Sequence, residues 1–379
     1  DTATTTTHSN TTTTTPTDPG RLVILDESGN IVVLDPDGAN ADAITEDAGT
    51  SAAYAQPIWS PDGQALAWGE VTDTGFAVGI HRFDSDERLT VPTSNLPFYL
   101  SWSPGGERIG VLHNGEDGID FNLVDVARSN IERVGTGAPY YFSWRPGGNI
   151  LVTHVGADHV ETIDFAGVST TLEPTGPFYL APQWTDVGVF HVAADELLVE
   201  SEDGTRAPVA AVSGLTMFVA NPQGTRVALQ MTGAGDALEV ALSETPIIPS
   251  GAVSVVDVET GAVDSVVDDL AVGFFWSPTG DSLLALVPDV TGSVVPHVWT
   301  AGDGVEDYPS YQPTAAMLRD TFPFFPQYAQ SVNFWAPDGS AFAYAGVVDG
   351  EEGIWVQPLT DAPRTRVSAG RWVAWSLPG

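Results

Sequence analysis

Short apolar stretches separated by glycine-containing turns recur along the chain from residue 21 onward. Residues 98–101 and 108–112 flank one such turn, and similarly short stretches follow at 118–124 and 130–134. Apolar runs of about 4–8 residues bounded by turn residues are typical of β-strands. The pattern therefore predicts an all-β protein built from units of four short antiparallel strands.

One turn of each unit has a recurring sequence: tryptophan, a small or polar residue, proline, and a turn that ends in glycine. Proline presets φ for a turn and the final glycine accepts a positive φ, so the motif predicts a hairpin between the first two strands of a unit. We interpret the tryptophan as packing between units rather than as a ligand platform. The motif occurs at residues 59–63, 102–106, 144–148, 276–280 and 335–339, with altered copies at 183–186, 220–224 and 375–379.

Eight copies, mostly about forty residues apart, predict the blades of a β-propeller. Residues 371–376 supply only the innermost strand of an eighth blade, and residues 21–26, 30–35 and 41–45 can supply its other three strands. Pairing the two ends of the chain in this way removes exposed sheet edges. We expect eight four-stranded antiparallel blades; seven is the alternative if the altered copy at 183–186 does not begin a full blade.

The tryptophan–proline–glycine repeats resemble those of TolB-like β-propellers, which are relatives of the WD-repeat propellers, and the resemblance covers residues 21–379. It implies a single propeller domain over this range. It leaves the function open, because such propellers serve as scaffolds, binding modules and parts of enzymes.

Residues 1–20 differ from the rest of the chain, with eleven threonines and no apolar periodicity. Such a segment cannot bury enough surface to offset its ordering entropy, so we expect a flexible stalk. Asn10 begins a glycosylation sequon, and threonine-rich tracts resemble O-glycosylated stalks. An unmodified linker is the alternative. Asp1 opens directly on the stalk, as an N-terminus left by removal of an export signal would, and we expect an extracellular or cell-surface location.

The composition excludes several kinds of protein. With no cysteine, the chain has no disulfide, thiolate metal site or thiol nucleophile. Its 50 acidic and 13 basic residues give a net charge of −37, which repels nucleic acid. No stretch approaches the roughly 18 apolar residues that span a bilayer. All the basic residues are arginine; adaptation to high salt and a high-GC genome both explain such an acidic, lysine-free surface.

Tyrosines and histidines recur at equivalent positions in three consecutive blades. The tyrosines begin innermost strands, and the histidines end the adjacent second strands, so both sets fall on one face; Glu70 holds the equivalent position in blade one. A binding face is one interpretation, and packing inherited with the repeat is the other. Strands about 4.8 Å apart place the histidines too far from one another to share one zinc ion, whose ligands lie at about 2 Å. The binding-face candidates are Tyr99, Tyr141, Tyr179, His113, His154 and His191.

Two further segments carry candidate residues. Asp35, Asp37, Asn40 and Asp42 weakly resemble a calcium loop, although a tight turn explains them equally well and the distal glutamate of an EF-hand is missing. Insertions at 232–251 and 304–330 lengthen blade five and the passage from blade six to seven. The aromatic residues of the second insertion either pack onto the ring or form a partner surface, and the candidates are Tyr308, Tyr311, Phe322, Phe324 and Phe325.

These features favour an exported, non-catalytic propeller that binds or scaffolds other proteins or cell-surface components. No nucleophile elbow, zinc-protease helix or phosphate-binding glycine loop is present in the sequence, and we expect no cofactor. A lyase or hydrolase that uses the histidine and tyrosine face is one alternative function. A structural subunit of a surface assembly is another.

The net charge predicts a salt-dependent fold. Lowering the ionic strength from 1 M to 0.01 M lengthens the Debye distance from about 3 Å to about 30 Å, so repulsion between blades increases and the melting temperature falls. Thermal melts at the two ionic strengths measure the effect. An unchanged melting temperature would contradict the high-salt interpretation and leave genome composition as the explanation.

Overall fold

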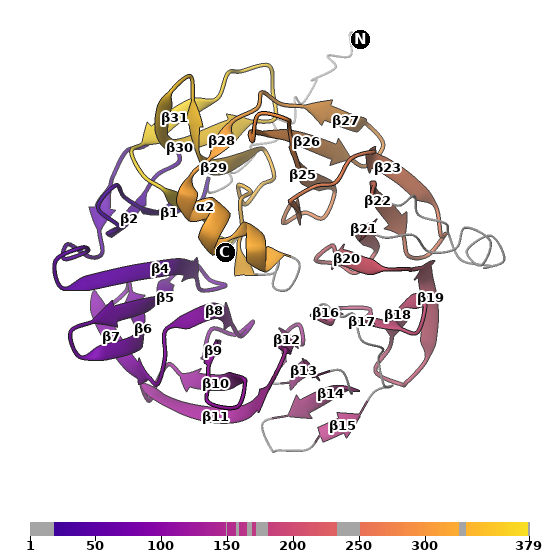
Figure 1. The fold of residues 1–379 in the computed structure, drawn as a ribbon, viewed down its shortest axis with the longest axis horizontal. Helices are drawn as coiled ribbons and strands as arrows, with labels where there is room; N and C mark the ends of the chain where they lie inside the picture. The colour runs from indigo at the N-terminus through magenta and orange to yellow at the C-terminus, as the bar shows by residue number, and fades with distance from the viewer. Residues whose placement is uncertain are drawn as a thin grey trace, which may run out of the picture.

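The chain forms a ring of eight β-sheets around a central axis (Figure 1). The structure, a computed structural model, describes residues 19–148, 150–156, 159–164, 169–171, 181–232, 251–325 and 331–377. Within these residues every sheet has four antiparallel strands, so the predicted eight-bladed propeller is confirmed. The altered copy at 183–186 begins a complete blade, and the seven-bladed alternative is therefore wrong.

Blades one to four follow one another along the chain, and each begins with the strand nearest the axis. Blade one has β4 (Ala52–Trp59), β5 (Ala65–Thr72), β6 (Gly75–Arg82) and β7 (Glu87–Thr93). Blade two has β8 (Pro97–Trp102), β9 (Arg108–Asn114), β10 (Ile119–Asp125) and β11 (Asn130–Gly137). Blade three has β12 (Tyr140–Trp144), β13 (Ile150–Val155), β14 (His159–Asp164) and β15 (Ser169–Thr171). Blade four has β16 (Gln183–Thr185), β17 (Gly188–Ala193), β18 (Glu196–Glu200) and β19 (Arg206–Ala211).

Blades five to seven continue the ring, and blade eight joins the two ends of the chain. Blade five has β20 (Leu215–Ala220), β21 (Arg226–Thr232), β22 (Val253–Asp257) and β23 (Val263–Val267). Blade six has β24 (Gly273–Trp276), β25 (Ser282–Pro288), β26 (Val294–Thr300) and β27 (Gly304–Asp307). Blade seven has β28 (Gln312–Pro313), β29 (Ala341–Val348), β30 (Glu351–Pro358) and β31 (Thr365–Ser368). Blade eight has β32 (Trp372–Trp375), β1 (Leu22–Leu25), β2 (Ile31–Leu34) and β3 (Asp42–Ala43).

The hairpins between first and second strands follow the physics of the sequence motif. In blade one the amide of Gly63 donates to the carbonyl of Ser60 at 2.9 Å, with Gly63 at φ +67°. Gly106 repeats this bond with Ser103 at 2.9 Å and φ +77°. The glycine at the end of each turn is needed because side-chain-bearing residues rarely adopt this φ.

The repeat tryptophans link neighbouring blades. The indole of Trp335 donates to the carbonyl of Phe275 at 2.9 Å, and that of Trp276 donates to Val219 at 2.8 Å. Trp144 and Trp102 make the same kind of bond, at 3.3 and 3.4 Å, to residues of the blade before. In each case the acceptor immediately precedes the equivalent repeat position. These residues therefore pack between blades, as the sequence predicts.

Blade eight closes the ring, because its innermost strand and its second strand come from opposite ends of the chain. β1 pairs with β32 over four residues, from Leu22 opposite Trp375 to Leu25 opposite Trp372. The backbone bonds continue beyond the strands, where Ser376 donates to the Arg21 carbonyl at 2.8 Å. All four β1 side chains are buried. The predicted pairing of N-terminal strands with the C-terminal strand is confirmed.

The innermost strand of blade seven is interrupted. β28 pairs with one end of β29, and Trp335 makes an isolated bridge with Phe342 near the other end. Between them the chain leaves the sheet to form helix α2 (Ala315–Asp320) and the 3-10 turn η1 (Phe322–Phe324). The expected insertion at 304–330 therefore begins too early, because residues 304–307 are the outer strand of blade six and 312–313 already belong to blade seven. None of the described helices is long and apolar enough to cross a membrane.

Blade-to-blade packing leaves little free space in the core. The rings of Phe121 in blade two and Phe142 in blade three lie 4.5 Å apart. Gly110 makes room for this contact, because a Cβ at that position would lie 2.5 Å from the ring of Phe142. Close packing of this kind holds each blade against the next without covalent links.

Replacing Trp335 by phenylalanine should destabilise the ring more than the same change at Trp59. The first variant removes the indole bond to the Phe275 carbonyl, which keeps its pairing with Leu284, and we expect a loss of about 0.5–1.5 kcal/mol. The indole nitrogen of Trp59 is buried with no hydrogen-bond partner among the described residues, so Trp59→Phe breaks no such bond. Both changes remove the same side-chain volume. Urea unfolding of the two variants measures the difference, and equal losses would contradict a stabilising role for the indole bond.

Candidate functional site

The three candidate histidines lie on the second strands of blades two to four, and all are buried. In blade two, Nδ1 of His113 donates to the Asn114 carbonyl at 3.0 Å, while Nε2 accepts from the Asn122 amide at 2.9 Å. In blade four, Nε2 of His191 lies 3.3 Å from the buried carboxylate of Glu200. Both histidines therefore bond within their own blades.

His154 in blade three lies opposite Tyr141 in the strand pairing, with the two rings 5.8 Å apart. The equivalent residue of blade one, Glu70, accepts from the indole of Trp68 at 3.0 Å and from Arg88 at 2.9 Å. The topology thus brings equivalent positions to one end of neighbouring blades, as predicted. Their side chains are buried, and the proposal of a binding face at these residues stays a prediction.

The candidate tyrosines that the structure describes are also buried. Tyr99 lies at the central channel, where its hydroxyl hydrogen-bonds to the side chains of Ser331 and Ser101, and burial raises its pKa. Burial likewise raises the pKa of Tyr141. Tyr179 lies outside the described residues.

The aromatic residues of the second insertion pack onto the ring where their side chains are described. The ring of Tyr311 stacks on Tyr344 at 3.9 Å, and the ring of Tyr308 meets Phe342 edge-on at 5.6 Å. Phe322 and Phe325 are buried. The backbone of Phe324 belongs to η1, and its side chain lies outside the described atoms. Packing, one of the two interpretations left open by the sequence, accounts for these four side chains.

The calcium candidates form the turn between β2 and β3. The Asn40 amide donates to the Asp35 carboxylate at 2.6 Å, and Asp37 accepts from the Ala39 backbone at 2.9 Å. Asp42 is exposed. In the part of the chain that the structure describes, no group of three or more His, Asp or Glu side chains is placed to hold a metal ion. The glycosylation candidate Asn10 lies outside the described residues.

The feature that the sequence analysis missed is a plug at the central channel, formed by α2, η1, Phe325 and residues 331–334. Figure 1 shows α2 near the centre of the ring. The plug begins at Thr314, whose hydroxyl caps α2 by accepting from the Met317 amide at 3.2 Å. The same hydroxyl donates to the Arg371 carbonyl of blade eight at 2.6 Å. Thr321, which lies between α2 and η1, accepts a hydrogen bond from the indole of Trp372 at 3.1 Å.

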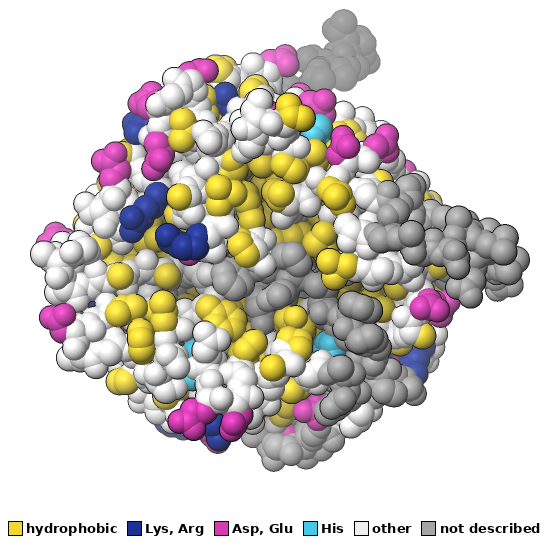
Figure 2. All heavy atoms as spheres, in the orientation of Figure 1, with side chains coloured by type: hydrophobic (Ala, Val, Ile, Leu, Met, Phe, Trp, Pro, Cys, Tyr) yellow, Lys and Arg dark blue, Asp and Glu magenta, His cyan; other side chains and the backbone are white. Residues whose placement is uncertain are grey.

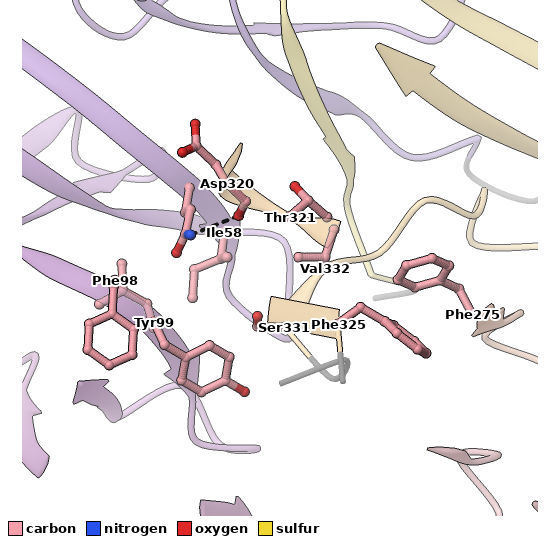
Figure 3. A pocket seen from close by; sticks show the side chains of 11 residues that line it. Ile58, Phe98, Tyr99, Phe275, Asp320, Thr321, Phe325, Ser331 and Val332 are labelled. Atoms are coloured by element: carbon pink, nitrogen blue, oxygen red, sulfur yellow. Dashed lines mark hydrogen bonds between the residues drawn. The ribbon is translucent and has the colours of Figure 1, made fainter. Parts of the chain in front are cut away.

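The plug also contacts blades one, two and six. A bulge in β4 holds Gln56 at φ +49°, and its amide donates to the Asp320 carbonyl at 2.9 Å. Phe325 lies between Phe274 and Phe275, at ring distances of 4.7 and 5.1 Å. A cavity of about 20 Å³ remains between the plug and the inner strands near Tyr99 (Figure 3). This cavity has room for about one water molecule, so α2, η1 and the inner strands pack closely here.

At the other end the channel opens into a hollow of about 250 Å³, lined by Phe274, Phe275 and Trp276 together with several amide side chains. The amides are engaged with the backbone. Gln183 donates to the Phe218 carbonyl at 2.7 Å, and the Asn221 oxygen accepts from Thr225 at 2.8 Å. The hollow therefore offers mainly apolar surface.

On the face that carries α2, hydrophobic side chains gather around the centre, while acidic side chains lie mainly along the margin (Figure 2). The topology places there the starts of the innermost strands and the turns between second and third strands. Exposed hydrophobic residues in these segments and in α2 are Leu96, Leu215, Leu270, Val290 and Leu318. Exposed acidic residues in the same segments include Glu27, Glu46, Asp73, Glu116, Asp117, Asp195, Asp268, Asp269 and Asp349.

Comparisons with known proteins identify the fold. Neither protein-family models nor curated proteins give a match to this chain. Similar solved structures include TolB from Acinetobacter baumannii (14% identity, TM-score 0.44), which covers 77% of this chain and 64% of its own. An oligogalacturonate lyase in complex with manganese is 13% identical (TM-score 0.54; 90% of this chain, 98% of its own). A eukaryotic initiation factor is 12% identical (TM-score 0.55; 96% and 99%).

These similarities concern the fold alone. The solved structures similar to this chain include TolB proteins and other β-propeller proteins, and the chain is itself an eight-bladed propeller, consistent with the resemblance of its repeats. The chain spans 64% of the length of the TolB structure that it matches. The activities named for these proteins differ from one another, as expected when one fold carries many functions.

The buried tyrosines predict a sharp loss of stability at alkaline pH. Burial raises the pKa of Tyr99 and Tyr311 above the ordinary value of about 10, and raises that of Tyr344 to about 12. Above pH 10 the folded state therefore binds more protons than the unfolded state. Each such tyrosine lowers the free energy of unfolding by up to about 1.4 kcal/mol per pH unit.

Tyrosinate absorbance and circular dichroism, followed together from pH 9 to 12.5, measure this effect. We expect most tyrosinate to appear together with unfolding, and Tyr99→Phe to remove one tyrosine from that cooperative step. A smooth titration near pH 10 in a chain that stays folded would contradict the burial of these hydroxyls.

Proposed function

We propose that the protein is a non-catalytic binding module that holds another protein against the face carrying α2. The observation that carries this proposal is the apolar centre of that face surrounded by an acidic margin (Figure 2). Protein interfaces commonly combine an apolar core, where contacts exclude water, with a polar rim. The plug supports the same proposal, because α2 adds the exposed Leu318 to this face.

The partner's chemistry follows from the charge of the face. The chain carries a net charge of −37, so a partner with basic residues around an apolar patch is attracted from a distance and oriented on approach. Leucine side chains at the centre would supply contact area, and the acidic margin would select against acidic proteins. The charge of the margin would thus give the apolar centre its selectivity for basic partners.

We further propose that the protein works outside the cell or at its surface. The threonine-rich residues 1–20 with the sequon at Asn10 support this location. Treating the protein purified from its source with a glycosidase, and comparing its mass before and after, tests the part of this proposal that concerns Asn10. A mass that does not change would contradict glycosylation.

Substitution of the apolar centre tests the binding function. Proteins of the native extracellular fraction are captured on immobilised full-length chain, in parallel for wild type, Leu270→Asp with Leu318→Asp, and the control Val305→Asp. Leu270 and Leu318 are 50% and 54% exposed, and Val305 is 41% exposed at the opposite end of an outer strand. All three proteins should therefore fold alike.

We expect wild type and the Val305 variant to retain the same basic protein, and the double variant to lose at least about 90% of it. Retention should also fall between 0.05 and 0.5 M salt if the acidic margin contributes. Identical capture by all three proteins would contradict a role for this face. Self-association lost only in the double variant would instead favour a structural subunit of an assembly.

A further inference from the structure

Trp184 in blade four departs from the other repeat tryptophans. Five repeat tryptophans are buried, and their indole nitrogens donate to backbone carbonyls. They are Trp102, Trp144, Trp276, Trp335 and Trp375. Trp184 is partly exposed. It lies in the copy of the motif whose turn is shortened, since Thr185 pairs directly with Gly188. Blade four therefore has the repeat tryptophan, although the turn that usually follows it is shortened.

Other groups make the inter-blade contacts at this position. The backbone amide of Trp184 donates to the hydroxyl of Ser143 in blade three at 3.0 Å. On the other side, Gln183 donates to the Phe218 carbonyl and accepts from the Ala220 amide, both at 2.7 Å. The indole of Trp184 packs against the cluster of Val152, Val160 and Val189, and its partly exposed remainder lines a surface. The strand that carries it is fixed between its neighbours.

That surface is a cleft of about 450 Å³ between blades three and four. Blade three contributes Arg145 and the hydroxyls of Thr162 and Thr170, and blade four contributes Trp184 and the turn after β18. The volume falls in the range of small-molecule sites, about 300–1,000 Å³. A flat aromatic wall and several hydroxyl and charged groups thus meet in a space that fits one or two sugar rings.

The charged groups of the cleft are held in place. Arg145 forms an ion pair with Glu202 across the two blades, and its guanidinium lies 5.9 Å from the centroid of the Trp184 ring. The carboxylate of Glu200 is bonded to Arg206 at 2.9 Å and to His191 at 3.3 Å. Together with Asp203, these groups leave the wall with more carboxylates than guanidinium groups.

We propose that this cleft binds an uncharged sugar. The apolar C–H face of a pyranose ring would lie against the part of the Trp184 indole that Arg145 leaves exposed. The ring hydroxyls would donate to the carboxylates of Glu202 and Asp203 and accept from Arg145. Because carboxylates outnumber cations in the wall, a uronic acid would be repelled by it and by the net charge of −37. The site is separate from the α2 face and independent of the binding function proposed there.

Calorimetric titration of the full-length chain with cellotriose tests the proposal, because every hydroxyl of its glucose rings is equatorial and both ring faces present C–H groups. Trigalacturonate serves as the anionic comparison. We expect cellotriose to bind at least tenfold more tightly than trigalacturonate. Trp184→Ala should weaken cellotriose binding at least tenfold, a change of about 1.4 kcal/mol, and Trp184→Phe should weaken it less, because a flat ring remains.

Charge-matched variants separate the cleft from folding effects. Glu202→Gln should weaken cellotriose binding, whereas Glu259→Gln, an exposed neutralisation on blade five, should leave it unchanged. Thermal melts establish that each variant is folded. No binding of cellotriose at 10 mM, equal binding of trigalacturonate, or binding indifferent to both Trp184→Ala and Glu202→Gln would each overturn the proposal.

Discussion

The pairing of β1 with β32 is the contact on which the rest of the ring depends. Each of the other blades takes its four strands from one continuous stretch of chain, whereas this sheet joins residues about 350 positions apart. Without it, blades one and seven would each have an open side, and the buried apolar residues of β1 would face water. The tryptophan hydrogen bonds between successive blades hold the whole propeller together only because blade eight closes the ring.

Closure also determines what the plug can do. α2 and η1 leave blade seven, yet their hydrogen bonds reach blade eight at Arg371 and Trp372 and blade one at Gln56. A segment bonded to several blades fixes their relative positions. The apolar centre of the α2 face therefore exists because the ring brings these separate strands within reach of one insertion.

The departures from the repeat carry the functional proposals. Most tryptophans that obey the motif bond to the neighbouring blade, and the buried histidines of blades two and four bond to Asn122 and Glu200 of their own blades. Blade seven, with its split inner strand, supplies the plug, and blade four, with its shortened turn, leaves Trp184 partly exposed beside a cleft. The repeat motif specifies the propeller scaffold. The blades that depart from the motif carry surfaces that the other blades lack.

The sequence by itself determined the four-stranded blades and the closing strands, because turn residues and short apolar runs act over distances of a few residues. It favoured eight blades over seven, and the complete sheet that begins at β16 decided the count. The sequence also brought the tyrosines and histidines to equivalent positions of neighbouring blades. Only the tertiary structure decided that Tyr99 faces a plug, that the histidines are buried, and that Trp184 is partly exposed. Those outcomes depend on side chains from distant segments that compete for the same space, and no local pattern encodes which of them fills it.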